Sequence, residues 1–437
     1  MKMSHRFSIG ILSAIVIAAA SPAAHAQKSY KFAFGGKPEA GWTQVTPASS
    51  YSKEIGYGFE PGALPAAVGA DALGADKPFY FSVAEPEGNY KVTVTFGSAS
   101  APSDNTVKAE LRRLMLEKIH TDAGQSVTRS FIVNVRIPQY PGGVVRLKAP
   151  RETTQEARAW DDKLTIEFNH DDAKSAVSKV EIEKVDVPTI YILGDSTVCD
   201  QSGETFNSWG QMLTRWFGTG VAIANHAESG ETLASSIGER RFAKVYSLLK
   251  PGDYVLMQFA HNDMKNNSPN ALATYKTTYA QVIGEIRAKG ATPVLVAAME
   301  RSNGANSDTL KGYPAAALET AAAQKAASID LHSMSQVFYR ALGADVKKAF
   351  NDGVTHHNNY GSYELSKMIV MGIKADKLDI VKYIVPDFKD FDPAKPDPMA
   401  TFKMALSAGR TAERPLGDES TFGPGAGAAT PPAPPAR

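Results

Sequence analysis

One short stretch constrains the fold of this chain most: the apolar run at residues 190–193, followed directly by Gly194, Asp195 and Ser196. An uninterrupted apolar run suits a strand that is buried on both faces, which is typical of a parallel sheet covered by helices. Gly194 permits a sharp exit from such a strand, and Ser196 is then expected at its carboxyl end, opening a helix. Because open α/β sheets keep their ligands at that edge, the stretch predicts a functional serine there.

The pattern after Pro188 extends this prediction to a whole domain. Apolar runs alternate with helical patterns, as they do in βαβ units. The predicted strands are 189–193, 221–224, 254–259, 293–298 and 328–331, and the predicted helices are 206–216, 236–249, 272–289, 313–327 and 360–373. We therefore expect an α/β fold over residues 187–375, a three-layer αβα sandwich with a five-stranded parallel sheet.

The region before Pro188 has a different character. Short alternating or aromatic runs, split by Gly, Pro, Asn and Asp, indicate β-strands at 30–34, 78–83, 90–97, 107–116, 127–135 and 164–168. Their spacing favours an all-β sandwich over residues 27–186. Arg112 and Arg113 are expected to face outward from the strand at 107–116.

The two ends of the sequence predict export and a loose tail. Residues 1–26 combine a basic start, an apolar stretch and the small-residue site Ala24-His25-Ala26, which is the pattern of a cleavable signal peptide. We expect a secreted or periplasmic protein. Residues 376–422 are expected to form a strap that packs its aromatic side chains on the core, and residues 423–437, rich in Pro, Gly and Ala, are expected to be disordered.

Charge and cysteine content exclude several classes of protein. Lys and Arg number 47 against 46 Asp and Glu, so there is no basic field for a nucleic acid or an anionic membrane. No apolar stretch after the signal peptide is long enough to span a bilayer. Cys199 is the single cysteine, so no internal disulfide framework holds the fold together and a sizeable core must do so.

A second block of residues supplies what a nucleophilic serine needs. Asp352 and His356 lie ahead of a predicted helix, about 155 residues after Ser196. A base near the hydroxyl, held by a third group, makes serine nucleophilic near neutral pH, so Ser196, His356 and Asp352 are the candidate nucleophile, base and orienting acid. The candidate oxyanion donors are the Ser196 amide and two loops at predicted strand ends, which carry Gly230 and Asn262.

These four blocks, around Ser196, Gly230, Asn262 and His356, resemble those of the SGNH (GDSL) hydrolases. The β-rich region before them, with the runs 261–263, 299–301 and 358–365, is similar to the bacterial two-domain rhamnogalacturonan acetylesterases. The resemblance implies an SGNH hydrolase fold preceded by a jelly-roll domain of the galactose-binding type. It also implies that Ser196 attacks acetyl esters of pectic rhamnogalacturonan through an acetyl-enzyme, with no cofactor or metal.

One spacing departs from the family. The acid and base are usually arranged as Asp-x-x-His, whereas three residues separate Asp352 from His356 here, and Gly353 is expected to absorb the extra one. His356 is the preferred base because it keeps the family's spacing to Asn358 and Tyr360. The adjacent His357 is the alternative.

Other functions remain open on the sequence. Within the superfamily, the alternatives are an acetylxylan esterase and a lipase or thioesterase; outside it, a carbohydrate-binding protein with an inactive hydrolase domain. The lack of a long apolar lid and the β-rich domain favour acetylated plant cell-wall polysaccharide as the partner. A metal site of His226 and His261 with His356 is disfavoured, because no pair has zinc-like local spacing. Trp42, Tyr80 and Trp160 are candidate sugar-stacking platforms in the β-rich domain, although a core position suits each better.

Overall fold

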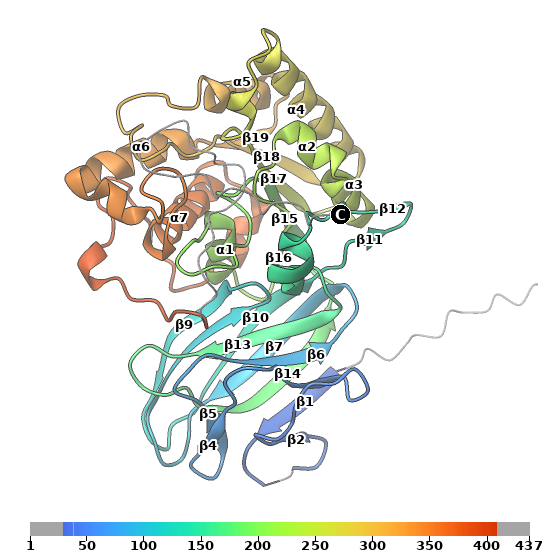
Figure 1. Cartoon of the computed structure of the whole chain (residues 1–437), viewed down its shortest axis with the longest axis vertical. Helices are drawn as coiled ribbons and strands as arrows, with labels where there is room; N and C mark the ends of the chain where they lie inside the picture. The colour runs from blue at the N-terminus through green and yellow to red at the C-terminus, as the bar shows by residue number, and fades with distance from the viewer. Residues whose placement is uncertain (1–28, 38, 409–437) are drawn as a thin grey trace, which may run out of the picture.

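The structure is a computed structural model in which residues 29–37 and 39–408 are described. A β-rich part, at the bottom of Figure 1, is followed by an α/β part above it. This order agrees with the expected β-rich region followed by an α/β region. The predicted signal peptide at 1–26, the predicted tail at 423–437 and residues 409–422 of the predicted strap lie outside the described residues. Every helix that the structure describes is too short or too polar to cross a membrane.

The β-rich part consists mainly of two sheets that face one another. The seven-stranded sheet contains β1 (Ser29–Phe34), β2 (Thr43–Val45), β4 (Ala66–Val68), β5 (Ala72–Gly74), β7 (Gly88–Phe96), β10 (Val127–Val135) and β14 (Val177–Val185). The five-stranded sheet contains β3 (Tyr57–Phe59), β6 (Phe79–Ala84), β8 (Ser103–Ala109), β9 (Arg113–Thr121) and β13 (Lys163–Asn169). Inward side chains of both sheets, including Phe34, Phe81 and Phe96, share one core. Buried and partly exposed residues alternate along β7, so one face of this sheet packs on the core and the other faces solvent, as expected for a sandwich.

The prediction of one strand at 107–116 is wrong. Residues 110–112 close a turn between β8 and β9, with left-handed φ values of 54° at Glu110 and 62° at Arg112. The outward placement of the two arginines is also wrong. Arg113 Nε lies 2.7 Å from Asp200 Oδ2 and Arg112 Nη2 lies 2.6 Å from Glu204 Oε2, and both arginines are buried against the α/β part.

The α/β part is built on a sheet of parallel strands. These are β15 (Thr189–Gly194), β16 (Ala222–Asn225), β17 (Tyr254–Gln258), β18 (Thr292–Val296) and β19 (Ala327–Ile329), in the order β16-β15-β17-β18-β19. Ile190 and Ile192 of β15 contribute to one core, and Tyr191 and Leu193 contribute to a second. The apolar run is continuous because helices cover both of its faces.

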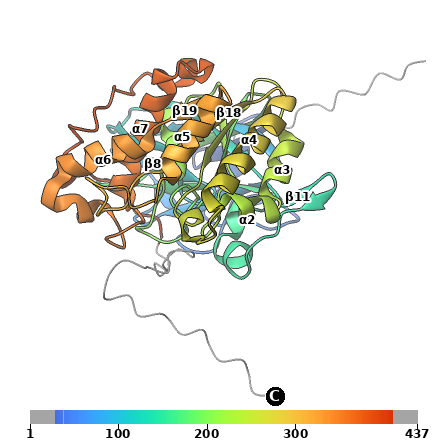
Figure 2. The same ribbon diagram turned by 90° about the horizontal axis from the view of Figure 1, so that it is seen from above.

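The helices form the two outer layers. They are α1 (Trp209–Leu213), α2 (Leu233–Gly238), α3 (Arg241–Leu248), α4 (Ala271–Ala288), α5 (Tyr313–Ala323), α6 (Leu331–Leu342) and α7 (Asn359–Ala375). Figure 1 shows α6 and α7 on one side of the sheet and α2, α3 and α4 on the other, and Figure 2 shows the same division from above. The core of the first group contains Trp209, Phe338 and Met368, and that of the second contains Phe242 and Tyr279.

Two helix predictions are wrong in detail. The stretch at 236–249 is not one helix, because Arg240, with a φ of 65°, separates α2 from α3. Ser196 does not open a helix: residues 195–198 form a turn, and α1 begins only at Trp209, after Ser208 has capped it by accepting from Gln211 N. The sequence analysis did not predict α6.

The last described segment joins the two parts. Phe388 packs edge-on against Trp216, with ring centres 5.2 Å apart, and Phe402 packs on Tyr363 at 5.4 Å. Farther along, the carbonyl of Ala405 accepts a hydrogen bond of 2.7 Å from Lys108 of β8. This segment therefore lies on the α/β core and returns to the β-rich part.

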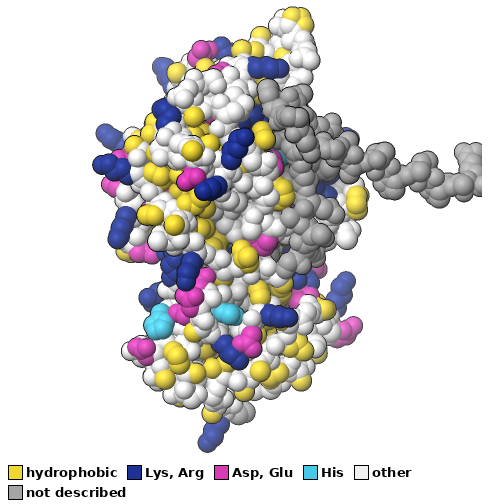
Figure 3. Space-filling view, turned by 60° about the vertical axis from the view of Figure 1, so that its left-hand side comes forward, with side chains coloured by type: hydrophobic (Ala, Val, Ile, Leu, Met, Phe, Trp, Pro, Cys, Tyr) yellow, Lys and Arg dark blue, Asp and Glu magenta, His cyan; other side chains and the backbone are white. Residues whose placement is uncertain are grey.

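Charged side chains of both signs share one face of the molecule. On the face drawn in Figure 3, basic, acidic and hydrophobic side chains are interspersed over both parts. Two of the suggested stacking platforms, Tyr80 and Trp160, are buried. The guanidinium carbon of Arg158 lies 4.0 Å from the ring centre of Tyr80, and that of Arg136 lies 4.6 Å from the ring centre of Trp160. Trp42 alone of the three is half-buried.

Candidate active site

Ser196 lies in the turn that follows β15, at the carboxyl edge of the sheet. Asp195 builds this turn: its Oδ1 accepts hydrogen bonds from Thr197 N at 2.9 Å and Thr197 Oγ1 at 2.7 Å. The carbonyl of Ser196 accepts from Gln201 Nε2 at 2.5 Å. Because backbone and neighbours are both fixed, the Ser196 side chain has one defined direction. Its Oγ lies 2.8 Å from His356 Nε2.

His356 is held from its other side by Asp352. The distance from His356 Nδ1 to Asp352 Oδ2 is 2.7 Å, so Nδ1–H donates to the carboxylate and the Nε2 lone pair is left to accept from Ser196 Oγ. Burial opposes ionisation of Asp352, but the bond from His356 and those from the backbone N–H groups of Val354 and Thr355 hold its pKa below the usual range. The carboxylate is therefore ionised throughout the neutral pH range.

The unusual spacing between Asp352 and His356 has a structural explanation. Asp352 Oδ1 accepts hydrogen bonds from the backbone N–H groups of Val354, Thr355 and His356, at 2.9, 2.8 and 3.1 Å. The chain can wrap around one oxygen in this way because Gly353 adopts a left-handed φ of 75°. As predicted, Gly353 absorbs the extra residue.

His357 points away from Ser196 into an aromatic pocket. Its ring packs on Phe350, with centres 4.0 Å apart, and its Nε2 lies 2.9 Å from Tyr339 Oη. Tyr339 donates its single proton to the carbonyl of Glu300, so His357 Nε2–H must be the donor to Tyr339. Burial lowers the pKa of His357 to about 3, which keeps it neutral. Of the two histidines, only His356 is in contact with the serine.

The three expected oxyanion donors lie on neighbouring loops. Gly230 follows β16 and has a left-handed φ of 77°, and Asn262 follows β17. Within the described residues, the backbone N–H groups of Ser196 and Gly230 meet no protein acceptor. The Asn262 side chain is oriented by two bonds, since its Oδ1 accepts from Lys265 Nζ at 3.0 Å and its Nδ2 donates to the carbonyl of Glu231 at 3.0 Å. One N–H of the amide then remains for a ligand.

A loop after β18 braces the segment that carries Asp352 and His356. Ser302 N donates to the carbonyl of Val354 at 2.9 Å, Ser302 Oγ donates to the carbonyl of Gly353 at 2.8 Å, and Arg301 Nη1 bonds to Thr355 Oγ1. Arg301 belongs to the run 299–301 that carried part of the resemblance, but no sequence pattern predicted its contact with Thr355.

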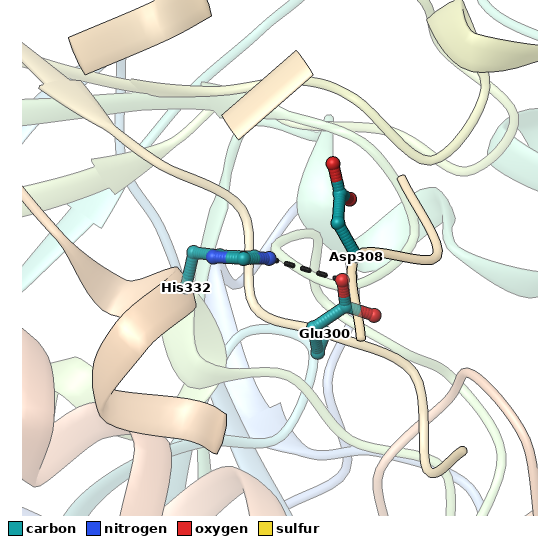
Figure 4. Close-up of side chains that lie close together, drawn as sticks. All are labelled: Glu300, Asp308 and His332. Atoms are coloured by element: carbon teal, nitrogen blue, oxygen red, sulfur yellow. Dashed lines mark hydrogen bonds and ion pairs between the residues drawn. The ribbon is translucent and has the colours of Figure 1, made fainter. Parts of the chain in front are cut away.

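Glu300, Asp308 and His332 form the one cluster of possible metal ligands found among the described residues, with ligand atoms within 4.8 Å of one another (Figure 4). Glu300 Oε1 already accepts from His332 Nε2 at 3.0 Å and from Thr309 N at 2.8 Å. The Asp308 carboxylate accepts from the backbone N–H groups of Leu310 and Gly312, at 2.7 and 2.6 Å. Burial opposes protonation of His332, but Glu300 raises its pKa, as in an ion pair. These bonds favour a brace for the loop over a metal site.

Two further histidines are buried and separate from the triad. His261 Nδ1 lies 3.4 Å from Asp195 Oδ2. His226 packs edge-on against Trp160, at 5.6 Å, and its pKa is lowered by burial and by nearby cations such as Arg136 and Lys244. Cys199 is buried, and burial raises its thiol pKa, so it behaves as a small apolar residue rather than a nucleophile.

The assembled geometry has a definite chemical capacity. A hydroxyl, an imidazole with a free lone pair and an ionised carboxylate form one hydrogen-bonded chain. The loops that carry Gly230 and Asn262 follow the two strands that flank β15 in the sheet. Such an arrangement can transfer the serine proton to the imidazole as the oxygen attacks a carbonyl carbon. It is suited to acyl transfer.

Comparisons with known proteins agree with this chemistry. Residues 192–362 match the GDSL-like lipase/acylhydrolase family. The rhamnogalacturonan acetylesterase RhgT of Bacillus subtilis is 30% identical over 217 residues, which cover 45% of this chain and 94% of that protein. The uncharacterized esterase YxiM of the same species is 27% identical over 371 residues, which cover 79% of this chain and 91% of that protein. The crystal structure of YxiM gives a TM-score of 0.44 at 25% identity, covering 80% of this chain and 99% of that one.

Proposed function

Because this chain belongs to the GDSL-like lipase/acylhydrolase family, we propose that it is a serine esterase that removes acetyl groups from pectic rhamnogalacturonan. The observation that carries the esterase proposal is the hydrogen-bonded chain from Ser196 through His356 to Asp352. Ser196 is the nucleophile, His356 is the general base, and Asp352 fixes the imidazole tautomer.

The reaction follows in two balanced steps. In the first, Ser196 Oγ attacks the acetyl carbonyl carbon while its proton passes to His356 Nε2. The tetrahedral intermediate then collapses, the bond to the sugar oxygen breaks, and His356 returns the proton to that oxygen. In the second step, water attacks the acetyl-serine carbonyl carbon while one of its protons passes to His356. The bond to Ser196 Oγ then breaks, His356 returns the proton to that oxygen, and acetic acid leaves and ionises to acetate. Asp352 stays ionised and stabilises the imidazolium in both steps.

The developing oxyanion is bound by the N–H groups of Ser196, Gly230 and Asn262. The amides of Ser196 and Gly230 can donate to it without first breaking another hydrogen bond, because no protein group in the described structure accepts from them. Removal of one such donor from an oxyanion hole typically lowers kcat by about 10²- to 10³-fold.

The substrate proposal is supported by the relatives. RhgT is named as a rhamnogalacturonan acetylesterase, and 94% of its own length matches 45% of this chain. We also propose that residues 1–26 direct export and that the enzyme acts outside the cytoplasm, where such a polymer is found.

Acetate release by the Ser196→Ala variant tests the proposal. The variant is expected to lose acetate release from acetylated rhamnogalacturonan and from p-nitrophenyl acetate, while its thermal unfolding stays close to that of the unmodified chain. Ser333→Ala, a change at an exposed serine of α6, is the matched control and is expected to keep full activity.

Two outcomes would contradict the proposal in different ways. Activity of the Ser196→Ala variant near that of the unmodified chain would exclude the serine mechanism. A higher kcat/KM on acetylated xylan than on acetylated rhamnogalacturonan would keep the mechanism and replace the substrate.

A further inference from the structure

Residues 147–160 of the β-rich part extend onto the loop that carries Gly230. From this segment, Lys148 Nζ donates a hydrogen bond of 2.6 Å to the carbonyl of Ser229. The same ammonium lies 2.6 Å from Glu231 Oε1. Lys148 therefore holds the residues on both sides of Gly230.

The bond to the Ser229 carbonyl fixes the direction of the Gly230 N–H. The two groups belong to one planar trans peptide, in which the C=O and the N–H point in opposite directions. Gly230 has a φ of 77° and, as a glycine, can exchange between backbone conformations that other residues avoid. With its carbonyl held by Lys148, this peptide cannot rotate freely, and the Gly230 N–H stays turned away from Lys148.

The bond to Glu231 connects Lys148 with Asn262, the side-chain donor of the oxyanion hole. The Glu231 carbonyl accepts from Asn262 Nδ2 at 3.0 Å, and Ser235 Oγ donates to Glu231 Oε2. The Glu231 side chain is fully buried, and the other nearby cation, Arg241, lies at 3.6 Å and is bonded to Glu152 at 2.6 and 3.0 Å. Lys148 is thus the closest cationic partner of a buried carboxylate whose own backbone positions Asn262.

Lys148 is itself well anchored in its domain. Its backbone N–H donates to Glu152 Oε2 at 2.7 Å, and Trp160 Nε1 donates to Glu152 Oε1 at 2.9 Å. Three residues farther on, Arg151 Nε lies 3.2 Å from Glu228 Oε1, at the start of the same loop. The backbone of Lys148 is therefore held in place, and its ammonium reaches the loop that carries Gly230.

We propose that Lys148, supplied by the β-rich domain, is a positioning residue that holds the Gly230 and Asn262 donors of the oxyanion hole in their productive orientation. The β-rich domain is then part of the catalytic unit. This inference rests on the proposed serine esterase mechanism. Because the donors act mainly in the transition state, their misplacement lowers kcat more than it raises KM.

The test compares three variants of the full chain: Lys148→Met, Lys148→Arg and Lys163→Met. Lys163 is the matched control, because it lies in the same domain, its side chain is 20% exposed against 26% for Lys148, and its Nζ lies 2.6 Å from Glu60 Oε1. On p-nitrophenyl acetate, Lys148→Met is expected to lower kcat about ten- to hundred-fold with KM within about two-fold. Lys148→Arg should recover part of the loss, and Lys163→Met should keep kcat.

A second readout separates positioning from general destabilisation. The rate at which a fluorophosphonate labels Ser196, measured well below the unfolding temperature of every variant, should fall in parallel with kcat in the two Lys148 variants and stay unchanged in Lys163→Met. If Lys148→Met lowers the unfolding temperature but keeps kcat and the labelling rate, Lys148 is only structural and the inference is overturned. If Ser196→Ala retains activity, the proposed esterase mechanism fails instead, and that result is distinct from the first.

Discussion

At the scale of single residues, the two oxygens of Asp352 have separate tasks. Oδ1 accepts three backbone N–H groups and shapes the segment 352–356, whereas Oδ2 accepts from His356 Nδ1 and fixes its tautomer. The same wrap places His357 on the opposite side, against Phe350 and Tyr339. The two adjacent histidines thus have different tasks because their side chains point to opposite sides of the backbone.

Glutamine at position 357 tests this division. The amide of His357→Gln can still donate to Tyr339, so kcat is expected to stay within about three-fold, whereas His356→Gln should lower kcat at least about 10³-fold. His357 has a pKa of about 3 and is already neutral above about pH 4, so its replacement should leave the acid limb of the pH–rate profile in place. A shift of that limb in His357→Gln would show that His357 takes part in the proton transfer.

At the scale of elements, loops rather than strands set the site. Strands β15, β16 and β17 bring Ser196, Gly230 and Asn262 to one edge, and the loop after β18 braces the segment around Asp352 through Arg301 and Ser302. The strands were predictable because residues buried on both faces form continuous apolar runs. The bracing contacts were not, since they depend on loop conformations that leave no periodic pattern.

The errors of the sequence predictions have related causes. The turn between β8 and β9 was missed because Glu110 and Arg112, rather than glycines, adopt its left-handed conformations. Arg113 was expected at the surface because its partner Asp200 lies in the other domain, far away in the sequence. The spacing of Asp352 and His356, by contrast, was correctly attributed to Gly353, because a glycine is the usual residue for a left-handed turn.

Alanine at position 353 tests the role of the left-handed turn. A Cβ there would meet no atom within 4 Å, so the cost of Gly353→Ala comes from its φ of 75° alone. We expect a loss of about 1 kcal/mol in the free energy of unfolding, measured with denaturant, and a lower kcat as Asp352 is displaced. Gly353→Asn should be milder on both counts, since asparagine tolerates this conformation. An alanine variant with unchanged stability and kcat would mean that the turn can be formed without glycine.

At the scale of the whole molecule, buried ion pairs connect the two domains and the final segment. Glu204 belongs to the α/β part. Its Oε2 lies 2.6 Å from Arg112 Nη2 and its Oε1 lies 3.3 Å from Lys108 Nζ, both in the β-rich part. The backbone N–H of Ser407 donates to the same carboxylate at 2.9 Å. Burial opposes the charge of Glu204, but Arg112, Lys108 and the Ser407 N–H lower its pKa to about 2. One carboxylate therefore links three separate segments of the chain.

This link predicts how stability depends on acidity. The pKa of Glu204 is about 2 in the folded chain against an ordinary 4.5, so its contribution, of order 3 kcal/mol, is fully present above about pH 5 and is lost as the pH falls toward 2. Glu204→Gln should lower the free energy of unfolding at pH 7 and flatten its decline between pH 5 and 2. Urea unfolding at several pH values measures this. An equally steep decline in both proteins would assign the acid sensitivity to other groups.

The most direct test of the central claim is to map the site of covalent attachment after a fluorophosphonate has inactivated the full chain. If Ser196 is the nucleophile that His356 activates, mass spectrometry should find one phosphonyl group per chain on the peptide that contains Ser196, in proportion to the lost activity, and almost none in His356→Gln over the same time. Inactivation with the group on another residue, or full esterase activity in a chain already modified at Ser196, would contradict the account.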